Sequence, residues 1–196
     1  KDGFLDLPGM ALGDQCVPVF TNIEAKKQCL EVLNKFIPKF TNILNNLEKK
    51  SEESHPILAM KWVFALNWYA EGMRETNDSI ALAKLASCLD TLSSNGRRRG
   101  ITELLCNVYG HEKDSTLFED AGSRPITVSM FVAQFYDDGR SRILHGTLEN
   151  MLESFEIDRN RLAKVAREVL LDLANRLYIY KGEDSEQAFR TMKYDS

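Results

Sequence analysis

Apolar residues recur at steps of three and four along most of this chain, and this spacing limits the fold more than any other feature. The clearest run lies near the C-terminus, at Leu162, Val165, Ala166, Val169, Leu173 and Leu177. An α-helix turns once in about 3.6 residues, so these positions share one face of a helix. The spacing predicts an all-α fold, a bundle of about six helices.

Capping residues and prolines predict where these helices begin and end. Pro38 removes a backbone donor inside the first helix and should kink or split it. The expected helices run from Asn22 to about Lys50, from Ile57 to Arg74, from Asn77 or Asp78 to about Ser94, from Ile101 to Tyr109, from Pro125 to about Tyr136, and from Asp158 to about Tyr180.

The composition along the chain predicts three parts. Residues 1–21 carry several glycines and prolines, which favours an extended arm or the remnant of a preceding domain. Residues 22–180 form the helical domain, and residues 181–196 form a polar C-terminal tail that we expect to fray. The chain opens on Lys1 rather than Met, which is compatible with a piece of a longer protein.

Charge and composition narrow the function classes. The formal net charge is −4 and 43% of the residues are hydrophobic. Such a chain can bury a core, but it has no general affinity for nucleic acid, so any RNA contact must be local. The basic run Arg97, Arg98 and Arg99 is a candidate for contacts to RNA phosphates, although such a turn is more often a solvated loop.

Neither a membrane span nor a metal site is expected. No apolar run approaches the roughly 18 residues of a transmembrane helix, and no signal peptide is visible. The four cysteines are widely spaced without a C-x-x-C pair, which favours buried thiols in a reducing cytoplasm. His111 has no neighbouring cysteine, and His55 precedes a proline and is expected in a solvated turn. We therefore expect no metal and no cofactor.

The segment FYDDGRSRILHGT, residues 135–147, carries the residues best suited to chemistry. Arg140 offers a permanent, fork-shaped donor for phosphate. His145 offers an imidazole that titrates near neutral pH. Together these two side chains can act on a phosphodiester without a metal.

This pattern resembles the R-x(4–6)-H motif of HEPN domains, in particular the ApeA-like branch, and Ser141 fits the polar residue that often follows the motif arginine. The stretch Lys61–Leu92 resembles the paired first helices of that branch, with Asp90 where a glutamate is expected. The resemblance implies a helical, metal-independent endoribonuclease that works as a homodimer, beside a possible sensor domain, in an antiviral or toxin setting.

The same resemblance assigns roles. His145 would take the proton of a ribose 2′-OH, and Arg140 would hold the scissile phosphate. Asp90 is either a solvated or capping carboxylate or a group that orients the arginine or histidine. Ser141 either hydrogen-bonds within the motif or caps backbone.

Helical geometry constrains the motif. Within one regular helix, two residues five apart point about 140° away from each other and lie about 7.5 Å apart along the axis. We expect Asp137, Asp138 and Gly139 to end the preceding helix. Asp138 would then cap the next helix, and Arg140 at its start would fold back toward His145. Gly146 would let backbone or a partner chain approach closely.

Two other readings compete with the nuclease. One is a non-catalytic helical module for dimerisation or interaction, in which Arg140 and His145 are structural. The other is a nucleotide-binding HEPN domain that partners a nucleotidyltransferase, although no G-x-x-x-x-G-K loop is present. The aromatic residues of Ile57–Arg74 are expected in the core, with a base-stacking surface as the alternative.

Overall fold

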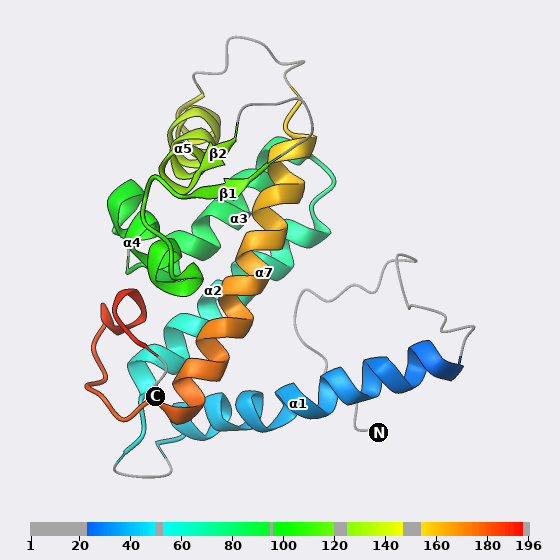
Figure 1. The fold of residues 1–196 in the computed structure, drawn as a ribbon, viewed down its shortest axis with the longest axis vertical. Coiled ribbons are helices and arrows are strands. Elements are labelled where there is room, and N and C mark those ends of the chain that lie inside the picture. The colour runs from blue at the N-terminus through cyan, green and yellow to red at the C-terminus, as the bar shows by residue number, and fades with distance from the viewer. Residues whose placement is uncertain (1–22, 50–52, 95, 120–124, 147–153, 194–196) are drawn as a thin grey trace. The chain divides into compact units, whose positions relative to one another are not determined.

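The computed structural model describes residues 23–49, 53–94, 96–119, 125–146 and 154–193 (Figure 1). In chain order, the elements are α1 (Ile23–Leu47), α2 (Pro56–Arg74), α3 (Asp78–Leu92), α4 (Arg97–Tyr109), β1 (Thr116–Phe118), β2 (Ile126–Thr127), α5 (Val128–Ala133), the π-helix η1 (Gln134–Ser141), α6 (Arg142–His145), α7 (Glu156–Ile179) and the 3-10 turn η2 (Ala188–Arg190).

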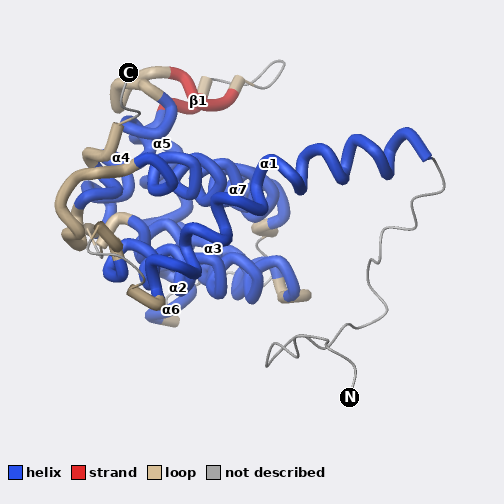
Figure 2. Tube along the Cα trace, turned by 90° about the horizontal axis from the view of Figure 1, so that it is seen from below, coloured by secondary structure: helices blue, strands red, loops and turns tan. Residues whose placement is uncertain are grey.

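The described chain is a bundle of six helices with one two-stranded hairpin, which confirms the predicted fold class. Figure 2 shows how little of the described chain is strand. The count of six arises because α5, η1 and α6 follow one another without a break and act as one rod. The contacts divide the chain at Pro38, within α1, and the unit Lys39–Ser196 contains the C-terminal end of α1 and the other five helices. α1 runs through Pro38, so the proline does not split it.

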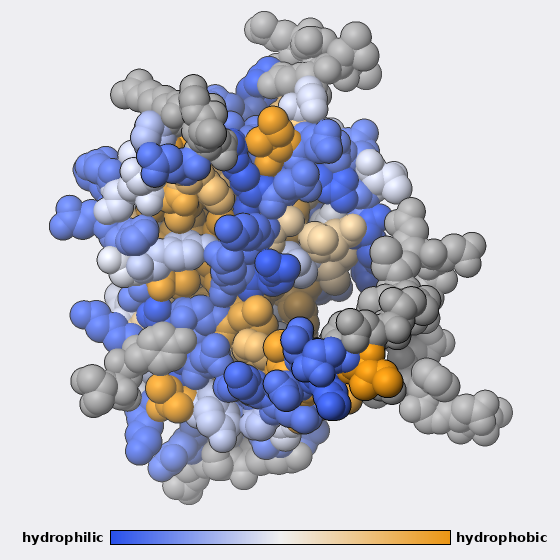
Figure 3. Space-filling model, turned by 45° about the vertical axis from the view of Figure 1, so that its right-hand side comes forward, coloured by the Kyte–Doolittle hydropathy of each residue, from blue (hydrophilic) through white to orange (hydrophobic). Residues whose placement is uncertain are grey.

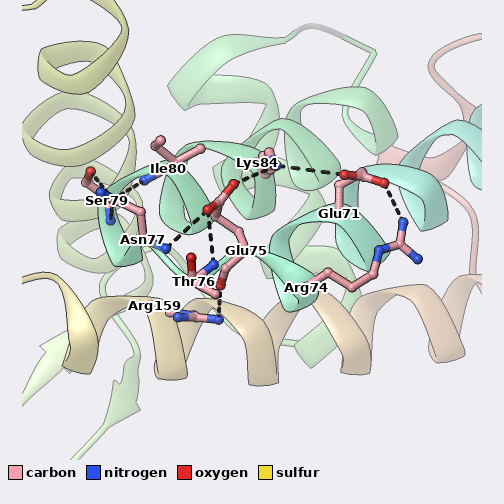
Figure 4. Close-up of polar contacts among 9 residues, drawn as sticks. All are labelled: Glu71, Arg74, Glu75, Thr76, Asn77, Ser79, Ile80, Lys84 and Arg159. Atoms are coloured by element: carbon pink, nitrogen blue, oxygen red, sulfur yellow. Dashed lines mark hydrogen bonds and ion pairs between the residues drawn. The ribbon is translucent and has the colours of Figure 1, made fainter. Parts of the chain in front are cut away.

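The tightest pairing in the bundle is the hairpin of α2 and α3. Asn77 begins α3 as predicted, because its side chain accepts hydrogen bonds from the backbone N–H groups of Ser79 and Ile80 (Figure 4). Arg159 of α7 donates to the Glu75 carbonyl in the turn at 2.8 Å and so ties the hairpin to α7. The cap and the cross-link together hold the turn at the start of α3, the helix that carries Asp90.

Packing around α7 forms the core. α7 contacts α2, α3 and α4, and Trp62 of α2 donates its indole N–H to the Leu170 carbonyl of α7 at 2.8 Å. The rings of Phe131 and Phe135 on the α5–η1 rod lie in the same core with their centroids 4.9 Å apart and their planes tilted by 60°. Aromatic side chains bury large apolar areas, so these contacts fix the rod against the bundle.

The expectation of a frayed tail is wrong for residues 181–193. Phe189 is fully buried and Met192 is 3% exposed. Arg176 of α7, itself 4% exposed, donates to the Met192 carbonyl and to the carbonyls at the end of α4. The segment looked polar because its few apolar residues are spaced by charged ones, yet those few point into the core.

Three further local predictions need correction. α4 begins at Arg97, so the arginine run is its first turn rather than a loop. β1 lies in the expected polar loop, and β2 with a Thr127 cap precedes α5 in place of a helix at Pro125. His55 is 7% exposed, and its Nε2 lies 2.9 Å from the Gly182 carbonyl oxygen, because the C-terminal segment covers it.

Candidate phosphate-binding and catalytic site

The arginine of the motif lies on a π-helix, not after a helix break. η1 continues α5 through Asp137 and Asp138, so neither residue ends a helix and Asp138 caps none. Gly139 is buried, and a Cβ there would lie 2.6 Å from Leu82 Cδ2. The glycine therefore permits close packing on α3 rather than a turn. π-helical turns are rare and occur often at functional sites.

Arg140 points from η1 to the end of α3, where it meets Asp90. Arg140 Nη2 lies 3.7 Å from Asp90 Oδ2, and Asp90 is 8% exposed. This burial argues against a solvated carboxylate. A capping role agrees with the hydrogen bond from the Arg97 backbone N–H at the first position of α4, and a carboxylate that faces the motif arginine agrees with the geometry as well. Among the described residues, Asp90 Oδ1 and Arg140 Nε are buried without a hydrogen-bond partner. Buried polar atoms left in this way are uncommon in folded proteins.

The Asp90 carboxylate is in an unfavourable environment. Burial raises its pKa, while the Arg140 guanidinium, the Arg97 backbone N–H and the Arg97 side chain each lower it in part. Desolvation is the larger effect because 3.7 Å is too long for a hydrogen bond that would satisfy the carboxylate.

Tyr136 forms the second support of Arg140. The guanidinium carbon lies 5.1 Å from the centre of the Tyr136 ring, a cation–π arrangement. Burial and then Asp90 raise the pKa of Tyr136. Arg140 is thus held between a carboxylate and a ring face, with a quarter of its side chain still exposed. Tyr136 stands four residues before Arg140 on the same rod, so its helical spacing was a signal that the sequence analysis did not use.

The N-terminus of α4 completes this cluster. Arg98 Nη1 lies 3.0 Å from Asp137 Oδ2 of η1, and Arg97 adopts a positive φ of 52° at the first position of α4. The first turn of a helix carries free N–H groups and partial positive charge, which favours an anion. Arg97 lies near Asp90, whose pKa it lowers, and Arg98 pairs with Asp137 on the rod that carries Arg140. Their contact to RNA phosphates stays a prediction. Asp137 was not among the predicted site residues.

His145 does not converge with Arg140 within this chain. It ends α6 and is exposed, and among the described residues it makes no hydrogen bond or ring contact with Arg140. The π-helix ends at Ser141, so most of the step to His145 is α-helical and turns the two side chains apart. The expected fold-back of Arg140 at a helix start is wrong. Gly146 ends α6 with a φ of 65°, and nothing lies near its Cβ position.

The remaining predicted residues have other surroundings. Ser141 lies inside the rod and makes no capping hydrogen bond. Arg99 is exposed, and its Nε lies 2.8 Å from Glu103 Oε1. The site therefore contains Arg140, Asp90, Arg97 and Arg98, with Tyr136 and Asp137 added, and has His145 one turn further along the rod.

Comparison with known proteins adds no family. No protein-family model, curated protein or solved structure matches this chain. Within the described part of the chain, no three His, Cys, Asp or Glu side chains are grouped in a way that would hold a metal ion. None of the described helices combines the length and the apolarity needed to cross a bilayer.

Proposed function

We propose that this chain is a metal-independent endoribonuclease that cleaves RNA by attack of a ribose 2′-OH on the adjacent phosphate. The observation that supports it best is the placement of Arg140. This cation is held between Asp90 and Tyr136 next to the first turn of α4, with an exposed imidazole further along the same rod. These are the groups that phosphodiester transesterification needs.

In the proposed reaction, His145 removes the proton of the 2′-OH as general base. The 2′-oxygen then attacks phosphorus, and the bond to the 5′-oxygen breaks to leave a 2′,3′-cyclic phosphate. Arg140 binds the phosphate and stabilises the charge that develops on its oxygens. The leaving 5′-oxygen must also receive a proton from an acid. The reaction requires the 2′-OH, so DNA resists.

A second copy of the chain supplies what one copy lacks. Arg140 and His145 of one chain point apart, so we propose that His145 of one copy serves the phosphate held by Arg140 of the other. In a two-fold dimer this composite site forms twice, and the protonated His145 or a water molecule gives the leaving 5′-oxygen its proton.

The first test is RNA cleavage in EDTA by the wild type and by Arg140→Ala and His145→Ala. We expect each substitution to lower the rate by about 10²–10⁴, because each removes a group that acts in the transition state. Lys164→Ala, an exposed change on α7, is the matched control. Absence of cleavage by the wild type, or equal rates for all variants, contradicts the proposal.

The second test mixes the two inactive variants. If the site is composite, heterodimers contain one intact Arg140–His145 pair, and the mixture regains up to about a quarter of the wild-type activity. If each chain works alone, no heterodimer has an intact pair and the mixture stays inactive. Sedimentation of the mixture checks that heterodimers form.

An interaction module is the second candidate, and one observation favours it. Ile57, Met60, Phe64 and Trp68 follow one another along one face of α2 and are 41–56% exposed. Figure 3 shows exposed apolar residues at several places on one face of the molecule. Uncovered apolar side chains in a row are typical of binding surfaces. The wild type would then cleave no RNA, and Phe64→Glu would abolish its self-association.

A further inference from the structure

We infer that single-stranded RNA binds along a basic groove beside α4, which starts at the candidate site and ends at the C-terminal segment. This inference rests on the proposed function, because it supplies the path of the RNA on either side of the cut. The α4 groove is lined by Arg99, Glu103 and Cys106 of α4 and by Gln187, Arg190 and Thr191 of the C-terminal segment, and has a volume of about 850 Å³. Figure 1 shows this segment beside α4.

The groove continues toward the site. A depression of about 500 Å³ shares Arg99 and Glu103 with the α4 groove and adds Arg98 and Lys113. Arg98 contacts Asp137 of η1, the element that carries Arg140. A strand bound at Arg140 can therefore pass Arg98 and enter the groove without crossing the bundle.

Its charge is opposite to that of the whole protein. Arg98, Arg99, Lys113 and Arg190 face the groove and the depression against the single carboxylate of Glu103. Among the lining residues, four cations against one anion leave +3, while the chain as a whole carries −4. Asp137, which pairs with Arg98, and Glu112 and Asp114 near Cys106 offset part of this positive charge. A cleft lined by one sign of charge concentrates ligands of the other sign. The partner is thus a polyanion, and it binds here rather than elsewhere on an acidic protein.

Glu103 holds two of these arginines in a defined arrangement. Its Oε1 lies 2.8 Å from Arg99 Nε and its Oε2 lies 3.2 Å from Arg190 Nη1. One carboxylate thus aims guanidinium groups from two elements at the same part of the groove. The pair with Arg99 is weak because that side chain is 91% exposed, so a phosphate can compete for the guanidinium.

The dimensions suit a short single strand. From Arg98 to Cys106, α4 rises about 12 Å, which spans a few phosphates at about 3.4 Å or more along one strand. The residues that line the groove and the depression include no aromatic side chain on which bases would stack. Binding should therefore depend on phosphates and salt and tolerate any base sequence.

The test measures binding of a fluorescent 2′-O-methyl oligouridylate, which lacks the attacking hydroxyl and stays intact, by anisotropy over a series of KCl concentrations. We expect Arg99→Ala/Lys113→Ala/Arg190→Ala to raise the Kd at low salt roughly tenfold or more and to reduce the salt slope by about 0.7 for each lost contact. Lys164→Ala/Arg167→Ala/Lys181→Ala removes equal charge from exposed positions elsewhere and should bind as the wild type does.

Arg190 also pairs with Glu103, so Arg99→Ala/Lys113→Ala, with both changes at the surface, serves as the second variant. Equal affinity and slope for the groove and control variants overturns the inference, as does a wild type that binds no RNA. Binding of a polyglutamate peptide as tightly as the RNA, through the same residues, also overturns it.

The two proposals fail in different ways. Groove-dependent binding by a wild type that does not cut RNA in EDTA supports the groove and contradicts the nuclease. Arg140- and His145-dependent cleavage with no effect of the groove variants on binding or on KM contradicts the groove and leaves the nuclease. If both hold, the groove variants raise KM while His145→Ala lowers kcat.

Discussion

Among single residues, Asp90 shows most clearly the conflict between stability and function. It is 8% exposed, and its guanidinium partner lies 3.7 Å away. Taking a carboxylate out of water costs several kcal/mol, and an ion pair without good hydrogen bonds repays only part of that cost. A residue kept in this way is expected to act on its neighbour. Here the neighbour is Arg140, and we propose that Asp90 holds it in place for an anion.

Asp90→Asn should therefore keep or raise stability at neutral pH, by up to about 1 kcal/mol. Burial raises the folded-state pKa of Asp90 above its unfolded value, so folding favours the protonated carboxyl. That contribution is fully present below the unfolded pKa and is lost as pH rises through the folded pKa. As the pH falls through the range in which carboxyl groups titrate, the free energy of unfolding of the wild type should therefore rise relative to that of Asp90→Asn. Urea unfolding at several pH values measures this difference.

Asp137→Asn is the matched control, because Asp137 also pairs with an arginine but has 47% of its side chain exposed. Its effect on stability should be small, because exposed ion pairs contribute little. A strongly destabilised Asp90→Asn at neutral pH would show that the ion pair stabilises the fold, against the argument above.

At the scale of elements, the α5–η1–α6 rod determines which way the motif faces. The wider π-helical turns carry the chain through Asp137, Asp138 and Gly139 without a break. This alters the direction of every later side chain relative to an α-helix. The rod can approach α3 closely because Gly139 has no side chain facing Leu82.

Gly139→Ala should destabilise the fold by about 1–3 kcal/mol, since its Cβ would lie 2.6 Å from Leu82 Cδ2. The rod must then shift, and Arg140 should lose its position against Asp90. Thermal unfolding measures the change. In a Leu82→Ala background the same substitution should cost much less, because the clash is gone. Additive effects of the two substitutions would contradict this account of Gly139.

At the scale of the whole molecule, the C-terminal segment closes the bundle and builds one wall of the α4 groove. Phe189 and Met192 enter the core, and Arg176 binds the segment to α7 and α4. Its removal would expose apolar surface and leave a buried guanidinium without the Met192 carbonyl. The segment is therefore part of the folded domain and not an appendage.

Phe189→Ala should lower the free energy of unfolding by about 3–5 kcal/mol, the usual cost of removing a buried phenyl ring. Tyr178→Ala, near the end of α7 and 48% exposed, is the control and should cost well under half as much. Denaturant unfolding separates the two. Similar values for both variants would mean that the segment detaches readily in solution.

Local patterns determined most of the secondary structure of this protein. The Asn77 cap, the proline at the start of α2 and the apolar stripe of α7 involve neighbours within one or two turns, so the sequence displays them directly. The motif residues Arg140 and His145 were visible for the same reason. A local pattern does not show which way these side chains face in the folded protein.

Only the tertiary structure decided which side chains meet. Asp90 and Arg140 are fifty positions apart, and their pairing depends on how η1 packs on α3. The direction of Arg140 depends on a π-helix, which has no clear spacing signal. The burial of His55 and Phe189 depends on a segment whose composition is that of a solvated tail. Long-range packing determines each of these, because the free energy of burial is shared among elements far apart in the chain.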